Sequence, residues 1–303
     1  MKGEGRLGQR GSTPVAVLRN LFGKAVLYLR MIKFSHSVFA LPFALTSAFI
    51  AAKGIPRGKT LLWIVVAMVS ARTTAMGLNR IIDRKIDAEN PRTAGRELPA
   101  ARIEVWETAL FVSIALAVFV LSAYMLNPLC FRLVGVALCC IVLYSFTKRF
   151  TWVSHFVLGI TISAAPVGAW IAVTGGFDVR ILLLGFAVIF WLAGFDILYA
   201  FQDVEFDRKY GLYSIPVRFG IGRSLLISRA CHFLTWALLV LTGISFGMAP
   251  FFYLGTVITA LLLLYEHSLV RADDLSKLNK AFFDMNGYIS ITVFFFTVLS
   301  YIV

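Results

Sequence analysis

The chain has 303 residues, of which 59% are hydrophobic and only 15% are charged. Soluble domains carry about 25% charged residues, so the composition excludes an ordinary soluble protein and indicates one that crosses a membrane several times. The formal net charge of +13 does not indicate nucleic-acid binding, because the basic residues gather in particular loops between apolar segments.

Nine apolar runs follow one another along the chain, most of them long enough to cross a bilayer, which takes roughly 20 residues per helix. They cover residues 35–52, 60–78, 106–126, 129–146, 153–174, 180–200, 225–246, 250–270 and 284–302. None alternates polar and apolar residues as the strands of a membrane β-barrel do. The sequence therefore predicts an all-α, polytopic membrane protein with about nine transmembrane helices around a central cavity, capped by cytoplasmic loops.

Residues 1–34 precede these runs and mix basic with apolar side chains, as in "VLRNLFGKAVLYLRMIKF". This pattern predicts a basic amphipathic helix on the membrane surface, ahead of one transmembrane domain over residues 35–303. A mitochondrial transit peptide is also basic and poor in acids, but it is normally rich in Ser, which is scarce here.

Lys and Arg are concentrated in the loops that share a side with the N-terminus. The connections on the opposite side are short and rich in Gly and Pro ("KGIPRGK", "NP", "GGFD", "GMAP"). The positive-inside rule places the N-terminus and the basic loops in the cytoplasm. The same positive charge suits anionic lipid or an anionic substrate.

Cysteine and histidine do not predict a metal or nucleophilic site. The four Cys have no metal-ligand spacing and lie mostly in or beside apolar runs, as small buried hydrophobes do. The four His are scattered, with no HExxH or triad-like grouping. They are His36, His155, His232 and His267.

Two acidic segments follow apolar runs at corresponding positions in the two halves of the chain. In "NRIIDRKID", Asn79, Asp83 and Asp87 are four residues apart, which keeps them on one stripe if the helix continues, since four residues turn it by about 40°. In "FDILYAFQDVEFDRKYG", the intervals from Asp196 to Asp203 and Asp207 are seven and eleven, which return to nearly the same face of a continuous helix. This weak internal repeat predicts one site between the halves.

Facing columns of oxygen ligands suit Mg²⁺, which is normally held by one or two carboxylates together with substrate phosphates. Neighbouring Arg and Lys would neutralise the remaining phosphate charge. A single DxxxD is weak evidence, because cytoplasmic loops of any membrane protein carry acids. Arg72 and Asp196 strengthen the prediction, since both lie inside apolar runs, where an unpaired charge is costly and marks a functional cavity.

From about residue 30 to its C-terminus, the chain resembles the UbiA superfamily of intramembrane aromatic prenyltransferases. Three groups of residues carry the resemblance, and the segment "FSHSVFALPFAL" also resembles the first helix of the family. They are Arg72, Asn79, Asp83 and Asp87 followed by "RTAGRELP"; Tyr144, Lys148 and Arg149; and Asp196, Tyr199, Asp203 and Asp207. One departure is Arg80, where many members have Asp; it lies about 100° from Asn79 on a helix and is not predicted to be a ligand.

The resemblance implies a reaction: Mg²⁺-dependent transfer of a polyprenyl group from its diphosphate to the ring of an aromatic acid resembling 4-hydroxybenzoate. It places this reaction in ubiquinone or menaquinone biosynthesis, at the cytoplasmic side of the bacterial inner membrane. A dihydroxynaphthoate is an alternative acceptor. The implied partners are therefore polyprenyl diphosphate, an aromatic acid and membrane lipid.

The resemblance also implies a role for each group of residues. Metal ligands are Asn79, Asp83, Asp87, Asp203 and Asp207; further contacts to the diphosphate are Lys85, Arg92, Arg96 and Arg149; catalytic residues are Arg72, Tyr144, Lys148, Asp196 and Tyr199. Lys148 and Arg72 would stabilise charge on the departing diphosphate. Asp196, with both Tyr residues nearby, would position the acceptor or stabilise the allylic cation.

Two other classes remain as alternatives. CDP-alcohol phosphotransferases also use acidic motifs and Mg²⁺ in membranes, but their paired DxxDG and GxxxDxxxD elements are absent from the sequence. A membrane cation or lipid transporter would favour acids near the middle of several helices, whereas these acids cluster at the predicted cytoplasmic end.

Overall fold

The computed structural model describes residues 14–33, 37–270, 275, 278 and 284–302. Within these ranges the chain forms helices and turns and no strands. Seven helices are long and apolar enough to cross a membrane, and two apolar helices are shorter. The predicted all-α, polytopic membrane architecture is therefore confirmed. The predicted number of nine spans stays a prediction, because it depends on the two shorter helices.

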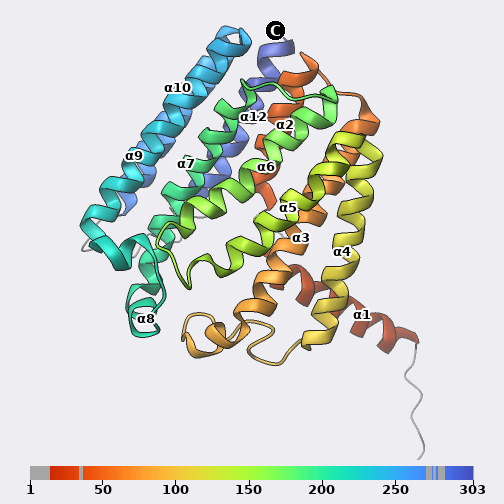
Figure 1. The fold of residues 1–303 in the computed structure, drawn as a ribbon, viewed down its shortest axis with the longest axis vertical. Helices are drawn as coiled ribbons and strands as arrows, with labels where there is room; N and C mark the ends of the chain where they lie inside the picture. The colour runs from red at the N-terminus through yellow and green to blue at the C-terminus, as the bar shows by residue number, and fades with distance from the viewer. Residues whose placement is uncertain (1–13, 34–36, 271–274, 276–277, 279–283, 303) are drawn as a thin grey trace, which may run out of the picture.

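The helices pack side by side in one bundle (Figure 1). In chain order they are α1 (Pro14–Met31), α2 (Ser37–Ala52), α3 (Gly58–Glu89), α4 (Val105–Leu126), α5 (Pro128–Thr147), α6 (Ser154–Thr174), α7 (Ile181–Tyr199), η2 (Ala200–Asp203), α8 (Val204–Lys209), α9 (Ile215–Phe246), α10 (Pro250–Leu269) and α12 (Asn286–Ile302). The helix α1 lies within the predicted N-terminal segment, of which residues 1–13 lie outside the described part. Its predicted place on the membrane surface stays a prediction.

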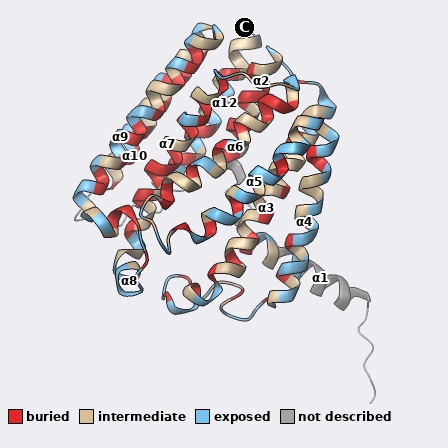
Figure 2. Ribbon diagram, in the orientation of Figure 1, coloured by how far each residue is buried: buried red, intermediate tan, exposed pale blue. Residues whose placement is uncertain are grey.

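The core of the bundle is α7, which packs against α6 on one side and α9 on the other. Most of α7 is buried (Figure 2). Leu184 and Trp191, for example, are 0% exposed. A helix that is apolar all round is stable only when neighbours cover every face. The outer helices instead leave many large apolar side chains exposed, as lipid-facing helices do.

A glycine fixes the crossing of α6 and α7. A Cβ atom on Gly159 would lie 2.7 Å from the carbonyl oxygen of Ile189, so no larger residue fits between the two backbones. This close approach fixes the position of α6 along α7 at their crossing point. One turn before Gly159 lies His155, and two turns after Ile189 lies Asp196.

The chain connections lie at two ends of the bundle. The lower end in Figure 1 holds the segment between α3 and α4, together with η2 and α8. Here α3 runs unbroken to Glu89, as the prediction of a helix through Asp87 requires. The second acidic segment differs, because α7 ends at Tyr199 and gives way to a 3₁₀ turn and then to α8. The assumption of one continuous helix from Asp196 to Asp207 is therefore wrong.

Candidate active site

A polar cavity of about 310 Å³ opens at this end of the bundle, within the size range of small-molecule sites, about 300–1,000 Å³. Its lining brings together side chains from α3, α5, α6, α7, η2 and α8 and from the loop after α3. Of the predicted site residues, those that line it are Arg72, Asn79, Asp83, Asp87, Arg92, Arg96, Tyr144, Lys148, Asp196, Tyr199, Asp203 and Asp207.

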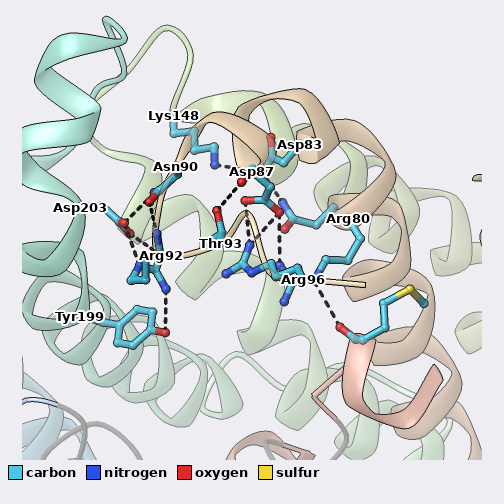
Figure 3. A network of polar contacts seen from close by, with 12 residues as sticks. Arg80, Asp83, Asp87, Asn90, Arg92, Thr93, Arg96, Lys148, Tyr199 and Asp203 are labelled. Carbon is cyan, nitrogen blue, oxygen red and sulfur yellow. Dashed lines mark hydrogen bonds and ion pairs between the residues drawn. The ribbon is translucent and has the colours of Figure 1, made fainter. Parts of the chain in front are cut away.

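Asp83 lies at the centre of the first acidic motif and is only 2% exposed. The side-chain amide of Asn79 donates to its Oδ2 at 3.0 Å, so the two residues share one stripe as predicted. Lys148 Nζ lies 2.9 Å from the same oxygen (Figure 3). Arg149 donates to Oδ1 at 2.9 Å. Since both cations follow the end of α5, they join α5 to the acidic stripe of α3.

Asp87 is also buried and paired with cations. Arg96 donates to both carboxylate oxygens at 2.8 Å, and Arg80 Nη1 lies 3.8 Å from Oδ2. The Nε of Arg80 donates to the carbonyl oxygen of Met31 at 3.2 Å. Arg80 is therefore a buried counter-charge to Asp87 that contacts the end of α1.

The loop after α3 forms part of the cavity lining and contacts the second motif (Figure 3). Asn90 donates to Asp203 Oδ1 at 2.9 Å. Arg92 binds both oxygens of Asp203, at 2.8 and 2.5 Å, and donates to the Tyr199 hydroxyl at 3.2 Å. Burial alone would lower the pKa of Arg92, but the hydrogen bond and ion pair with Asp203 outweigh burial and raise it. The basic loop thus connects the two acidic motifs.

The broken helix still brings all three acids of the second motif to the cavity wall. Asp196 lies in the last turn of α7, Asp203 ends the 3₁₀ turn, and Asp207 lies in α8. Asp207 has no hydrogen-bond or ion-pair partner for its carboxylate in the described part of the chain. It is thus the acid most available to a ligand.

Arg72 lies where the polar cavity meets a second, apolar cavity of about 170 Å³ between α3, α4, α5 and α6. Ala40, Ala75, Thr161 and Ile162 also line both cavities. Among the described residues that line the apolar cavity, Arg72 is the single charged one. Its Nε is buried without a hydrogen-bond partner in the described ranges, so a buried cation faces this junction.

Residues 40–295 match the UbiA prenyltransferase family. The chain belongs to the UbiA prenyltransferase family. It is 31% identical over 245 residues to a 4-hydroxybenzoate octaprenyltransferase of Vibrio parahaemolyticus, covering 80% of this chain and 85% of that protein. It is 32% identical over 261 residues to a protein of the same name from Pseudomonas aeruginosa, covering 85% and 86%.

Solved structures of UbiA homologues have the same fold. The apo structure of a homologue from Aeropyrum pernix K1 aligns with a TM-score of 0.80 at 28% identity, covering 87% of this chain and 97% of that one. A homologue from Archaeoglobus fulgidus bound to DMAPP and Mg²⁺ aligns with a TM-score of 0.71, covering 90% and 98%. Its 20% identity supports the shared fold alone.

Two residues predicted to contact the diphosphate do not line the polar cavity of this UbiA-family chain. Lys85 is exposed, because two residues turn a helix by about 200° from Asp83 and place Lys85 on the outer face of α3. Arg149 lies outside the lining and reaches the site through Asp83.

Two lining residues were not predicted. Lys33 follows α1 and lines the cavity; burial, with repulsion from Arg80 and Arg96, lowers its pKa to about 8. His155 also lines the cavity and lies 2.7 Å from Asp196, whereas no His was predicted to have a role in the site. The available signal was its position seven residues after Lys148, in the first turn of an apolar run.

The donor set fits Mg²⁺ only in part. Carboxylate and amide oxygens are suitable ligands, and among the described residues no cation forms an ion pair with Asp207 that would compete with a metal. No group of three or more His, Cys, Asp or Glu in the described ranges forms a ready metal site. A metal held here would therefore need further oxygen ligands, such as phosphate or water.

Proposed function

We propose that this chain transfers a polyprenyl group from polyprenyl diphosphate to the ring of an aromatic acid resembling 4-hydroxybenzoate, with Mg²⁺ as cofactor. The observation that carries the proposal is the meeting of two acidic motifs in one cavity, beneath a basic loop that binds both. An apolar cavity adjoins this site at Arg72. A diphosphate and an apolar tail need these two neighbouring environments. The names of the relatives from Vibrio and Pseudomonas support the same substrates.

The acids and bases would divide the work of binding. Asn79, Asp83, Asp203 and Asp207 would hold Mg²⁺, with Asp87 anchoring Arg96 beside them. When bound, Mg²⁺ neutralises diphosphate charge and makes it a better leaving group. Arg92 and Arg96, now bound to carboxylates, would turn toward the diphosphate oxygens.

Charge stabilisation then drives the transfer. The bond between the allylic carbon and the diphosphate oxygen breaks, and the diphosphate leaves with the electron pair. Lys148 and Arg72 would stabilise that developing charge, while Asp196, Tyr144 and Tyr199 face the carbocation or the acceptor. A carbon of the aromatic ring attacks the cation, and the ring then loses the proton of that carbon to an oxygen of the departed diphosphate. The covering loop excludes water, which would otherwise capture the cation.

We also propose that the polar cavity opens on the cytoplasmic side of a bacterial inner membrane, with the N-terminus on the same side. The distribution of Lys and Arg supports this orientation. Cysteine labelling from either side of sealed vesicles would test it. Glu89 is the last residue of α3, at the end of the bundle that holds the polar cavity. In a protein without native Cys, Glu89→Cys should react only from the cytoplasmic side.

The enzymatic proposal is tested with purified protein, Mg²⁺ and a labelled prenyl diphosphate. Wild-type protein should prenylate 4-hydroxybenzoate, and a parallel assay with dihydroxynaphthoate identifies the preferred acceptor. Asp83→Ala and Asp203→Ala should lose activity by about a hundredfold or more. Asp178→Ala is the matched control, because this acid pairs with Arg180 outside the polar cavity. Normal activity in both site variants would overturn the metal assignment, and a wild-type protein that transfers no prenyl group would overturn the function.

A further inference from the structure

His155 contacts Asp196 inside the polar cavity, although the two residues are 41 positions apart in the chain. Its Nδ1 lies 2.7 Å from Asp196 Oδ2. The residue is 4% exposed, so water does not compete strongly for this bond. Asp196 keeps 26% of its side chain exposed toward the cavity. His155 thus binds one oxygen of the Asp196 carboxylate, while the carboxylate stays accessible to a ligand in the cavity.

The second ring nitrogen determines where the imidazole carries its proton. The backbone N–H of Ile215 donates to His155 Nε2 at 3.4 Å. An amide N–H can only donate, so Nε2 must lack a proton for this bond to form. We therefore assign the proton to Nδ1, from which it is donated to Asp196. Asp196 then acts as an acceptor at Oδ2.

A backbone N–H contacts the ring directly, and a close approach of two helices fixes the helix that carries it. Ile215 is the first residue of α9, following the N-cap Ser214, and a first-turn N–H has no partner within its own helix. On the other side, the contact of Gly159 with Ile189 fixes α6 against α7. The imidazole therefore connects the start of α9 to the last turn of α7 through the start of α6.

We propose that His155 is a positioning residue that keeps Asp196 as a hydrogen-bond acceptor facing the aromatic substrate. The inference rests on the proposed function and names one property of its acceptor. With Oδ2 bound to His155, Oδ1 of Asp196 accepts a hydrogen bond from a hydroxyl group on the ring. That bond increases electron density on the ring and favours attack on the allylic cation. The acceptor class is therefore a hydroxyarene with a free O–H.

Two substitutions separate this role from a purely structural one. In His155→Asn, the amide NH₂ occupies the place of Nδ1 and still donates to Asp196. In His155→Gln, the longer amide reaches the place of Nε2, so its oxygen can accept from Ile215 while the bond to Asp196 is lost. If His155 acts by positioning Asp196, the Asn variant should be the more active of the two. If His155 acts only by accepting from the first N–H of α9, the Gln variant should be the more active.

The experiment compares wild type, His155→Asn, His155→Gln and Asp196→Asn in prenyl transfer to 4-hydroxybenzoate and to its 4-methoxy analogue. We expect His155→Gln to lower kcat/KM for the hydroxy acceptor by about tenfold or more, the size of a lost hydrogen bond to a charged group. KM for the prenyl diphosphate should change by less than about twofold, since the proposed diphosphate contacts do not include this pair. Asp196→Asn should abolish most of the preference for hydroxy over methoxy, and His155→Asn should keep it.

The readouts separate failure of the inference from failure of the proposed function. An active wild type with equal hydroxy preference in all four proteins, or with Gln more active than Asn, would overturn the role of His155 and leave the prenyl transfer standing. A wild type without prenyl transfer would overturn the proposed function and the inference with it. Thermal unfolding of each variant in detergent confirms that the rates compare folded proteins.

Discussion

The two acidic motifs occupy corresponding places in the sequence but differ in their physical surroundings. Asp83 and Asp87 lie on the unbroken helix α3, are 2% and 5% exposed, and each contacts two basic side chains. Asp203 and Asp207 lie beyond the end of α7, where Arg92 is the single described residue that forms an ion pair with either. The first motif therefore lies in a region of excess positive charge and the second in a region of excess negative charge.

This asymmetry indicates how the two halves divide their work. Basic side chains around the first motif suit the phosphate oxygens, while the less neutralised acids of the second motif suit the metal ion, which Asn79 and Asp83 would also contact. Arg92 lies between them and compensates the second motif when no ligand is bound. We infer that the first half is preorganised and that the second half rearranges when the metal and diphosphate bind.

The largest expected difference between the halves concerns stability. Asp87→Ala leaves the buried Arg80, which is 5% exposed, without its counter-charge. Removing one partner of a buried pair costs about 3–5 kcal/mol, so the thermal unfolding midpoint in detergent should fall by several degrees. Asp203→Ala should cost about 1 kcal/mol or less, because Arg92 is 29% exposed and can turn to water. Equal shifts in the two variants would contradict the asymmetry.

A smaller effect is expected for Arg92, which competes with a metal for Asp203. Arg92→Ala should increase the affinity of the substrate-free protein for Mn²⁺, used as a probe for Mg²⁺, by about three- to tenfold. The reason is that Mn²⁺ no longer has to displace the ion pair between Arg92 and the Asp203 carboxylate. The same variant should bind prenyl diphosphate more weakly. Calorimetric titration measures both affinities, and Arg92→Lys is the control that keeps the charge. Weaker Mn²⁺ binding by Arg92→Ala would contradict the competition.

A further expected effect comes from Lys33 and depends on pH. Its pKa is lowered to about 8 by burial and by nearby Arg80 and Arg96. The ammonium group is thus charged below about pH 7 and loses its proton as the pH rises through 8. Diphosphate binding should weaken over that range, by no more than tenfold per pH unit for one proton. Lys33→Arg should flatten this part of the profile, since Arg stays protonated; an unchanged profile would exclude Lys33 from the site.

The first motif could be predicted from the sequence because its geometry is local. Between Gly77 and Pro91 no Gly or Pro interrupts the helix, so a spacing of four residues is enough to align Asn79, Asp83 and Asp87. Asn90 ends the helix immediately before Pro91, as the restriction on a residue before proline favours.

The second motif could be predicted in composition but not in shape. Nothing in "YAFQDVEFD" demands a break after Tyr199. The conformation depends instead on burial of Phe201 and on bonds from Asn90 and Arg92 to Asp203, and these contacts span more than 100 residues. The pairing of His155 with Asp196 is hidden for the same reason, because it depends on the crossing of two helices and not on a local spacing.

The most direct test asks whether the two motifs act as one clamp. Mg²⁺-dependent binding of a non-hydrolysable prenyl diphosphate analogue is measured by calorimetry for wild type, Asp83→Asn, Asp203→Asn and the double variant. If both acids hold the same metal-bound diphosphate, the double variant should lose little more affinity than either single variant, since one loss already breaks the clamp. Losses in free energy that add fully would show two independent sites and would contradict the central claim.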